Sequence, residues 1–120
     1  FKKWPIKKNN IFSLEKKIRG YDVIISDFVP EAFELAKKLN IKSYGVCHYT
    51  WSWFFKKSGY KNIKHLKKLS EIELMANKIF IPPFAPKNMI KSVDQKKISK
   101  INFIMQKKKF IKKKIKNPSY

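Results

Sequence analysis

Two short runs of β-branched and apolar residues, separated by a helical segment that starts at a proline, constrain what this sequence can fold into. The first run, YDVIIS, covers residues 21–26, and the second, KSYGVC, covers residues 42–47. An uninterrupted apolar run of this length is typical of a strand buried on both faces of a parallel sheet. We therefore expect parallel strands joined by helices.

The segment between the two runs has the features of a short crossover helix. Pro30 suits the first turn of a helix, and Glu31 suits the positive end of the helix dipole. Apolar residues then recur at helical spacing: Ala32, Phe33, Ala36 and Leu39. Little more than Ile41 joins this helix to the second run, a connection length typical of βαβ units. The pattern predicts a helix over residues 30–39.

The same alternation continues along the chain. An apolar stripe of Leu66, Leu69, Ile72 and Met75 predicts a helix over 65–77, and KIFIP predicts a third strand over 78–82. Residues 100–105 are expected to form a fourth strand. The predicted fold class is α/β, a partial Rossmann-like domain with a parallel sheet flanked by helices. We expect one incomplete domain over residues 1–120, with a core at 21–105 and a lysine-rich segment at 106–120.

Candidate site residues follow two neighbouring predicted strands. In parallel α/β sheets, ligands bind beyond the carboxyl ends of the strands. This rule selects Ser26 and Asp27 after the first strand, and His48, Thr50, Trp51 and Trp53 after the second. We expect Val46 and Cys47 to be buried in the sheet and residues 48–53 to line the strand-end edge. An extended Trp-x-Trp segment would present both rings on one face.

Each candidate has a functional and a structural interpretation. Asp27 suits a general base or a hydroxyl ligand, but also a residue that caps the following helix. Histidine is a common general base, so His48 suits a base, but also a residue with structural hydrogen bonds. The aromatic rings suit a platform for a sugar or a lipid, but also packing against a helix. Cys47 is expected to behave as a small apolar residue, and His65, on a lysine-rich helix, is expected to be solvated.

The charge of the chain raises a second possibility. The formal net charge is +21, and Arg19 is the only arginine among 29 basic residues. Biased codon usage would also produce many lysines, and the scarcity of arginine disfavours specific contacts with nucleic acid. The segment 106–116 nevertheless suits a basic helix on an anionic membrane. Its candidate residues are Lys107, Lys108, Lys109, Lys112, Lys113 and Lys114.

Several kinds of site are excluded by what the sequence lacks. One cysteine cannot form an internal disulfide, which favours a reducing, cytoplasmic compartment. If the lysine-rich segment binds an anionic membrane, the protein would be attached to the inner face of that membrane. Three glycines provide neither a GxGxxG motif nor a P-loop, so we expect no nucleotide cofactor to bind this chain alone. No zinc-ligand set and no HExxH motif occurs, so no metal site is expected.

Beyond these patterns, the sequence resembles a known family. The stretch YDVIISDFVPEAFELAKKLNIKSYGVCHYTWSWFF resembles the amino-terminal domain of GT-B-fold glycosyltransferases. Within it, YTWSWFF is similar to the Phe-Thr-Trp-Asp-Trp pattern in the glycosyltransferase-like domain of sugar-kinase fusion proteins. ANKIFIPPFAP, residues 76–86, resembles the next strand of that domain. The likeness covers residues 20–115, and Ser52 departs from the pattern, which often has Asp there.

The resemblance implies sugar transfer from a nucleotide-sugar donor to an acceptor. It implies that this chain is the acceptor-side domain, with Ser26, Asp27, Thr50, Trp51 and Trp53 lining the acceptor site. A carboxy-terminal donor-binding domain would be the missing partner, and this chain alone would be inactive. It also implies a further strand upstream, whose absence would expose a sheet edge and lower solubility. The alternative function is a non-catalytic basic module that binds an anionic membrane surface or nucleic acid.

Overall fold

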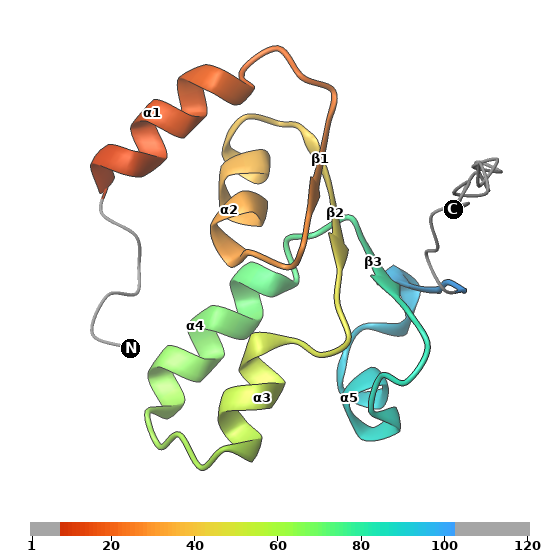
Figure 1. The fold of residues 1–120 in the computed structure, drawn as a ribbon. Helices are drawn as coiled ribbons and strands as arrows, with labels where there is room; N and C mark the ends of the chain where they lie inside the picture. Colours follow the sequence, from red (N-terminus) through yellow and green to blue (C-terminus); the bar gives the residue numbers. More distant parts are fainter. Residues whose placement is uncertain (1–7, 103–120) are drawn as a thin grey trace, which may run out of the picture.

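The fold is that of a computed structural model, which describes residues 8–102, with side chains from Ser13 onward. Helices and strands alternate along this part of the chain (Figure 1). The helices are α1 (Lys8–Ile18), α2 (Pro30–Lys38), α3 (Trp51–Lys57), α4 (Ile63–Glu73) and α5 (Lys87–Ser92). The strands are β1 (Val23–Ser26), β2 (Lys42–Val46), β3 (Lys78–Ile81) and β4 (Ile98–Lys100), and a 3-10 turn, η1 (Gln95–Lys97), precedes β4.

The four strands form one sheet in the order β1-β2-β3-β4, and every neighbouring pair is parallel. The predicted α/β class, the first three strands and the helices α2 and α4 are therefore confirmed. The sequence pattern places the fourth strand at residues 100–105, but it begins at Ile98 and ends at Lys100. The side chain of Asp94 accepts a hydrogen bond from the Lys96 N–H at 3.0 Å and starts the turn that brings Ile98 beside Ile79.

One face of the sheet carries the core. Gly45, Ile79 and Ile98 lie side by side in register on this face. Phe28 and Phe33 pack over Gly45 with their ring centroids 5.2 Å apart. A Cβ atom on Gly45 would lie 2.7 Å from Cδ2 of Phe28 and 2.8 Å from Cζ of Phe33, so only glycine leaves room for both rings.

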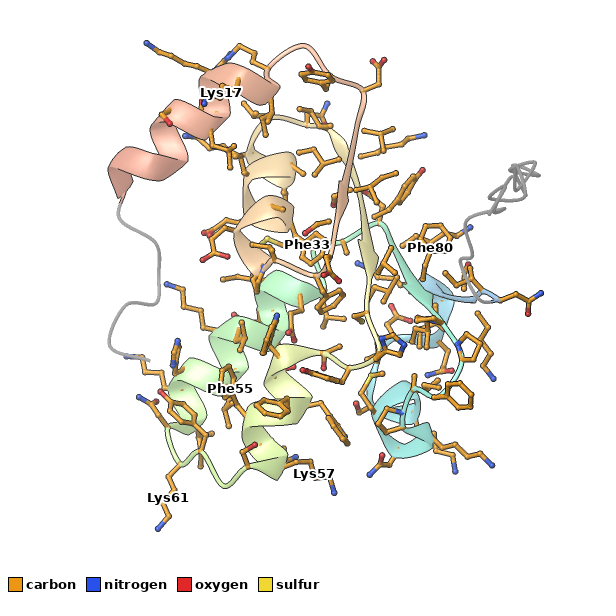
Figure 2. The ribbon with its side chains drawn as sticks, in the orientation of Figure 1. Lys17, Phe33, Phe55, Lys57, Lys61 and Phe80 are labelled. Atoms are coloured by element: carbon orange, nitrogen blue, oxygen red, sulfur yellow. The ribbon has the colours of Figure 1, made fainter. Side chains whose placement is uncertain are left out.

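The opposite face of the sheet is only partly covered. Figure 1 shows α1, α2 and α4 on one side of the sheet, and Figure 2 shows Phe33 and Phe80 on opposite sides of it. On the Phe80 side, Ile25 is 71% exposed, and Tyr44 contacts Phe80 edge to face at 5.8 Å. The expectation that the first strand is buried on both faces is wrong, because β1 is an edge strand with one open face.

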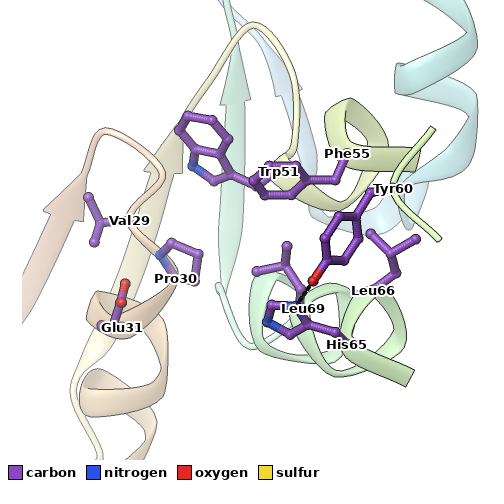
Figure 3. A pocket seen from close by; sticks show the side chains of 9 residues that line it. All are labelled: Val29, Pro30, Glu31, Trp51, Phe55, Tyr60, His65, Leu66 and Leu69. Carbon is purple, nitrogen blue, oxygen red and sulfur yellow. Dashed lines mark hydrogen bonds between the residues drawn. The ribbon is translucent and has the colours of Figure 1, made fainter. Parts of the chain in front are cut away.

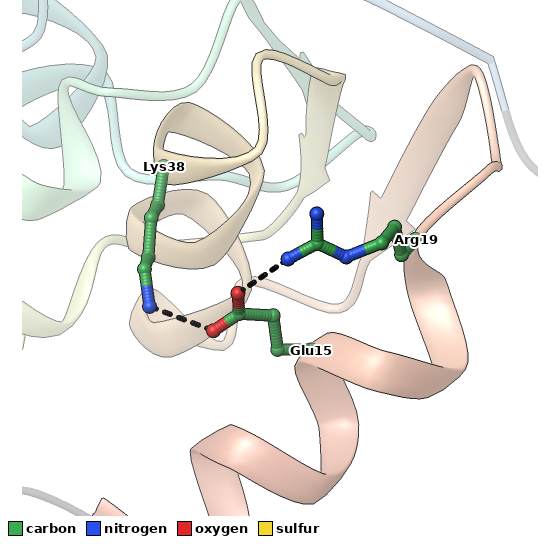
Figure 4. Close-up of polar contacts among 3 residues, drawn as sticks. All are labelled: Glu15, Arg19 and Lys38. Carbon is green, nitrogen blue, oxygen red and sulfur yellow. Dashed lines mark hydrogen bonds and ion pairs between the residues drawn. The ribbon is translucent and has the colours of Figure 1, made fainter.

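Helix α1 was not anticipated from the sequence. Its Glu15 accepts hydrogen bonds from Lys38 at 2.7 Å and from Arg19 at 2.9 Å, which ties α1 to α2 (Figure 4). The hydrogen bond from Lys38 and the two positive charges lower the pKa of Glu15 below its ordinary value. The bond between the two helices is the one from Lys38, because Arg19, the only arginine of the chain, lies just four residues after Glu15.

Substitution of Gly45 by Ala should destabilise the fold through steric overlap. We expect a loss of about 1–3 kcal/mol in the free energy of unfolding, measured by chemical denaturation. The same substitution in a Phe28→Leu background should cost less, because the ring that the new methyl group meets is then replaced by a smaller side chain. Equal costs in the two backgrounds would contradict this packing.

Substitution of Ile25 by Lys should raise solubility without lowering stability. The side chain is largely exposed, so its replacement removes little buried area and adds charge to an open sheet edge. Light scattering against protein concentration measures the effect. Ile24→Lys is the matched control: Ile24 is the next residue of β1 and is half-buried on the helix-covered face, so its replacement should lower the melting temperature instead.

Candidate functional site

The loop between β1 and α2 forms the first wall of the candidate site. The Ser26 hydroxyl accepts a hydrogen bond from the Val29 N–H at 2.9 Å and closes the turn. Phe28 has a φ of 54°, a left-handed conformation that costs a non-glycine residue about 1–3 kcal/mol. Burial of its ring to 2% exposure holds this conformation. Ser26 is therefore a structural residue of the turn, and Asp27 next to it is exposed.

The aromatic segment after β2 forms the second wall, and it is a helix. Thr50 is the N-cap of α3, and its hydroxyl accepts a hydrogen bond from the Trp53 N–H at 3.3 Å. The expectation that the Trp-x-Trp segment is extended is wrong, because both tryptophans lie in α3. At 3.6 residues per turn, Trp51 shares a face with Phe55 and not with Trp53. The Trp51 indole N–H donates to the Phe28 carbonyl at 3.1 Å and so joins the two walls.

A pocket of about 250 Å³ lies between these walls and α4 (Figure 3). Val29, Pro30 and Glu31 lie on one side of it, and Trp51, Phe55 and Tyr60 on the other. The remaining lining residues are His65, Leu66 and Leu69 of α4. The rings of Trp51, Phe55 and Tyr60 form a continuous row, which we call the aromatic ladder. The ring centroids of Trp51 and Phe55, which are stacked, are 6.0 Å apart, and those of Phe55 and Tyr60 are 5.7 Å apart.

His65 belongs to this pocket. The expectation that it is solvated is wrong, because it is half-buried and its Nδ1 lies 2.8 Å from the Tyr60 hydroxyl. Tyr60 was not a sequence candidate either. The two residues are close in the sequence, but it is the turn between α3 and α4 that brings their side chains together.

Trp53 lines a different hollow. A larger, more open groove of about 1010 Å³ runs between α3, α4 and α5, and Trp53, Ser52 and Glu73 line it. The structure therefore separates the two tryptophans that the sequence grouped together. Thr50 lines the same groove but is only 4% exposed, which fits its role as a helix cap.

Glu73 is a buried acid that organises the start of α3. Its carboxylate accepts hydrogen bonds from the Ser52 hydroxyl and, at 3.1 Å, from the Ser52 N–H. Burial raises the pKa of Glu73 above its ordinary value of 4.5, while the bonds from Ser52 and from the Trp51 N–H oppose that rise. Sequence reasoning missed this residue, because nothing local distinguishes it from Glu71, the other acid of α4.

The remaining candidates at the strand ends differ in exposure. His48 is exposed beyond β2, and Val46 is half-buried on the open face of the sheet rather than fully buried. Cys47 is 6% exposed, as expected. Burial, and the nearby charges of Glu73 and Asp27, raise the pKa of its thiol to about 12. Cys47 is thus a packing residue, because so little thiolate forms near neutrality.

Some predictions fall on residues that the structure does not describe. The lysines proposed to bind an anionic surface, from Lys107 to Lys114, lie outside residues 8–102. Within that range, no group of three or more His, Cys, Asp or Glu side chains is arranged to hold a metal ion. None of the helices in the same range has both the length and the apolar character needed to cross a bilayer.

The described residues define the class of the protein as α/β with an all-parallel sheet, in keeping with a partial Rossmann-like fold. Protein-family models, curated proteins and solved structures give no match to this chain. Function is therefore inferred from the geometry of the pocket and the groove.

Replacement of Glu73 by Gln should change how stability depends on pH. Because the pKa of Glu73 is raised, the folded state keeps its proton in a range where the unfolded state has lost it. Stability from this group is full below about pH 4.5 and decreases as the pH rises through the raised pKa. Glu73→Gln should remove that decrease, measured by denaturation between pH 4.5 and 8. Glu71→Gln, an exposed acid on the same helix, is the matched control and should leave the slope unchanged.

Proposed function

We propose that this chain forms the acceptor side of a glycosyltransferase that transfers a sugar from a nucleotide-sugar donor. The observation that carries the proposal is the aromatic pocket at the carboxyl end of the parallel sheet, between the β1–α2 loop and α3. Ligands of open α/β sheets bind at this edge. A few polar groups in a mainly aromatic and aliphatic lining are typical of small-molecule sites.

The pocket supplies two kinds of contact that an acceptor sugar or lipid-linked sugar needs. Trp51, Phe55 and Tyr60 offer ring faces and edges on which the apolar side of a sugar ring can stack. The Tyr60–His65 pair and Glu31 offer hydrogen-bonding groups at the same place. Asp27 and His48 are exposed at the strand ends, where they can form hydrogen bonds with hydroxyl groups of an acceptor that extends out of the pocket.

In this proposal, the nucleotide-sugar donor binds to another domain of the complete protein. The chain has three glycines and no glycine-rich loop that could hold a diphosphate. The reading frame that contains this sequence should therefore encode a second Rossmann-like domain with such a loop. The complete protein should release nucleotide from a nucleotide-sugar when it is given acceptor-containing extracts. A complete frame without that domain, together with no binding of nucleotide-sugars, would contradict the proposal.

Trp51→Ala in the complete protein should impair acceptor use more than donor binding. We expect kcat/KM for the acceptor to fall by about tenfold, ~1.4 kcal/mol, because a stacking surface is lost. The donor Kd should be unchanged. Trp53→Ala tests the groove on the other side of α3 in the same assay. If Trp53→Ala impairs acceptor use and Trp51→Ala only lowers the melting temperature, the acceptor does not bind in the pocket.

A further inference from the structure

The charge of the aromatic pocket is opposite to that of the chain. None of its nine lining residues is Lys or Arg, although the chain has 29 basic residues. Glu31 is the one lining residue with a formal charge at neutral pH when the histidine is neutral. A ligand that enters this pocket therefore meets a carboxylate and aromatic rings.

Glu31 is largely buried, but its carboxylate oxygens keep contact with solvent. The residue is only 8% exposed, and its carboxylate makes no hydrogen bond or ion pair with the residues whose side chains are described, 13–102. The other two buried acids of that range differ from it: Glu15 is bonded to Lys38 and Arg19, and Glu73 is bonded to Ser52. Since no described side-chain oxygen is both buried and unpartnered, the Glu31 carboxylate is accessible, and it lines the pocket.

The helix dipole explains only part of this arrangement. Glu31 lies in the first turn of α2, where a negative charge is favourable by about 0.3–1 kcal/mol. A carboxylate that pointed away from the pocket would gain the same benefit. The dipole therefore does not explain why the carboxylate lies in a pocket walled by Trp51, Phe55 and Tyr60.

We propose that the pocket binds an organic ammonium group, with Glu31 as its counter-ion and Trp51 and Tyr60 as the aromatic walls. Cations bind favourably near the faces of aromatic rings, and the interaction strengthens when water is excluded. The repulsion from distant lysines is screened over about 8 Å at physiological salt. A volume of about 250 Å³ limits the ligand to one ring or a short chain.

The inference deepens the proposed function and rests on it in one respect. If the chain binds a sugar acceptor, that acceptor carries a protonated amine, as an amino sugar or an amine-bearing lipid headgroup does. The binding of an ammonium group itself requires only the pocket and can be measured without any transfer reaction.

The test is a titration of the full chain with three probes of the same ring size: cyclohexylammonium, cyclohexanol and cyclohexanecarboxylate. Calorimetry gives affinities, and the NMR signal of the Trp51 indole N–H reports the place of binding. We expect the ammonium to bind about tenfold more tightly than the alcohol, and the carboxylate more weakly than both. Glucosamine against glucose repeats the comparison on a sugar ring and separates an amino sugar from a simple amine.

Glu31→Gln should lower the affinity for cyclohexylammonium about tenfold, to that of the alcohol, and leave the alcohol affinity unchanged. Glu34→Gln is the matched control, because Glu34 is exposed on the same helix and its replacement changes the net charge equally. Circular dichroism and the melting temperature verify that each variant is folded. If Glu31→Gln does not fold, the salt dependence of ammonium binding by the unmodified chain replaces it, since binding opposite a carboxylate weakens with salt.

Equal affinities for the ammonium and the alcohol would overturn the inference, as would equal losses in Glu31→Gln and Glu34→Gln. These outcomes are distinct from failure of the proposed function. Ammonium selectivity without any sugar transfer would support the site and contradict the glycosyltransferase. Transfer to neutral acceptors without ammonium selectivity would support the glycosyltransferase and contradict the ammonium site.

Discussion

The close approach of two phenylalanine rings to a backbone without a side chain is the contact on which the candidate site depends. Phe28 and Phe33 occupy the space over Gly45 that a Cβ atom would fill. Phe28 holds a left-handed backbone conformation only because its ring is buried there. That conformation directs its carbonyl to the Trp51 indole at 3.1 Å, and Trp51 in turn begins α3. Packing in the sheet thus determines the position of the aromatic ladder.

The same contact explains why the pocket is aromatic on one side and narrow. Trp51 is held against the β1–α2 loop. Phe55 follows it on the same face of α3, and Tyr60 follows in the loop that leads to α4. Tyr60 reaches His65 and closes the ladder on the second helix. The pocket is the space left between this ladder and the start of α2. Its shape depends on long-range packing, whereas its charge depends on a single residue, Glu31.

The fold was largely predictable, because its signals are local. A proline at a helix start, apolar residues at helical spacing and a very short connection identified β1, α2 and β2 without any knowledge of tertiary contacts. The exposure of β1 was not predictable, since a short apolar run looks alike in a central strand and in an edge strand. Helix α1 was missed in part because the bond that joins it to α2 links Glu15 to a distant residue, Lys38.

The errors at the site have a similar physical origin. Polar and aromatic residues alternate from His48 to Ser52, and this alternation suggested a strand. Thr50, however, is a favourable N-cap residue, and a helix begins after it. Attention to that one residue would have predicted α3 and would have separated Trp51 from Trp53. The Glu73–Ser52 pair joins residues of different helices, so no single segment of the sequence could reveal it. The Tyr60–His65 pair is local, but it depends on the shape of the turn before α4, which the apolar pattern does not predict.

The Glu73–Ser52 pair also limits which residues position 52 can accept. An acid at this position would place a second carboxylate against the buried carboxylate of Glu73. Two carboxylates at hydrogen-bond distance cannot both ionise without a large penalty. Serine instead donates its hydroxyl to Glu73, and Glu73 accepts the free N–H groups at the start of α3. A chain with Asp at position 52 would therefore need a neutral or basic residue at position 73.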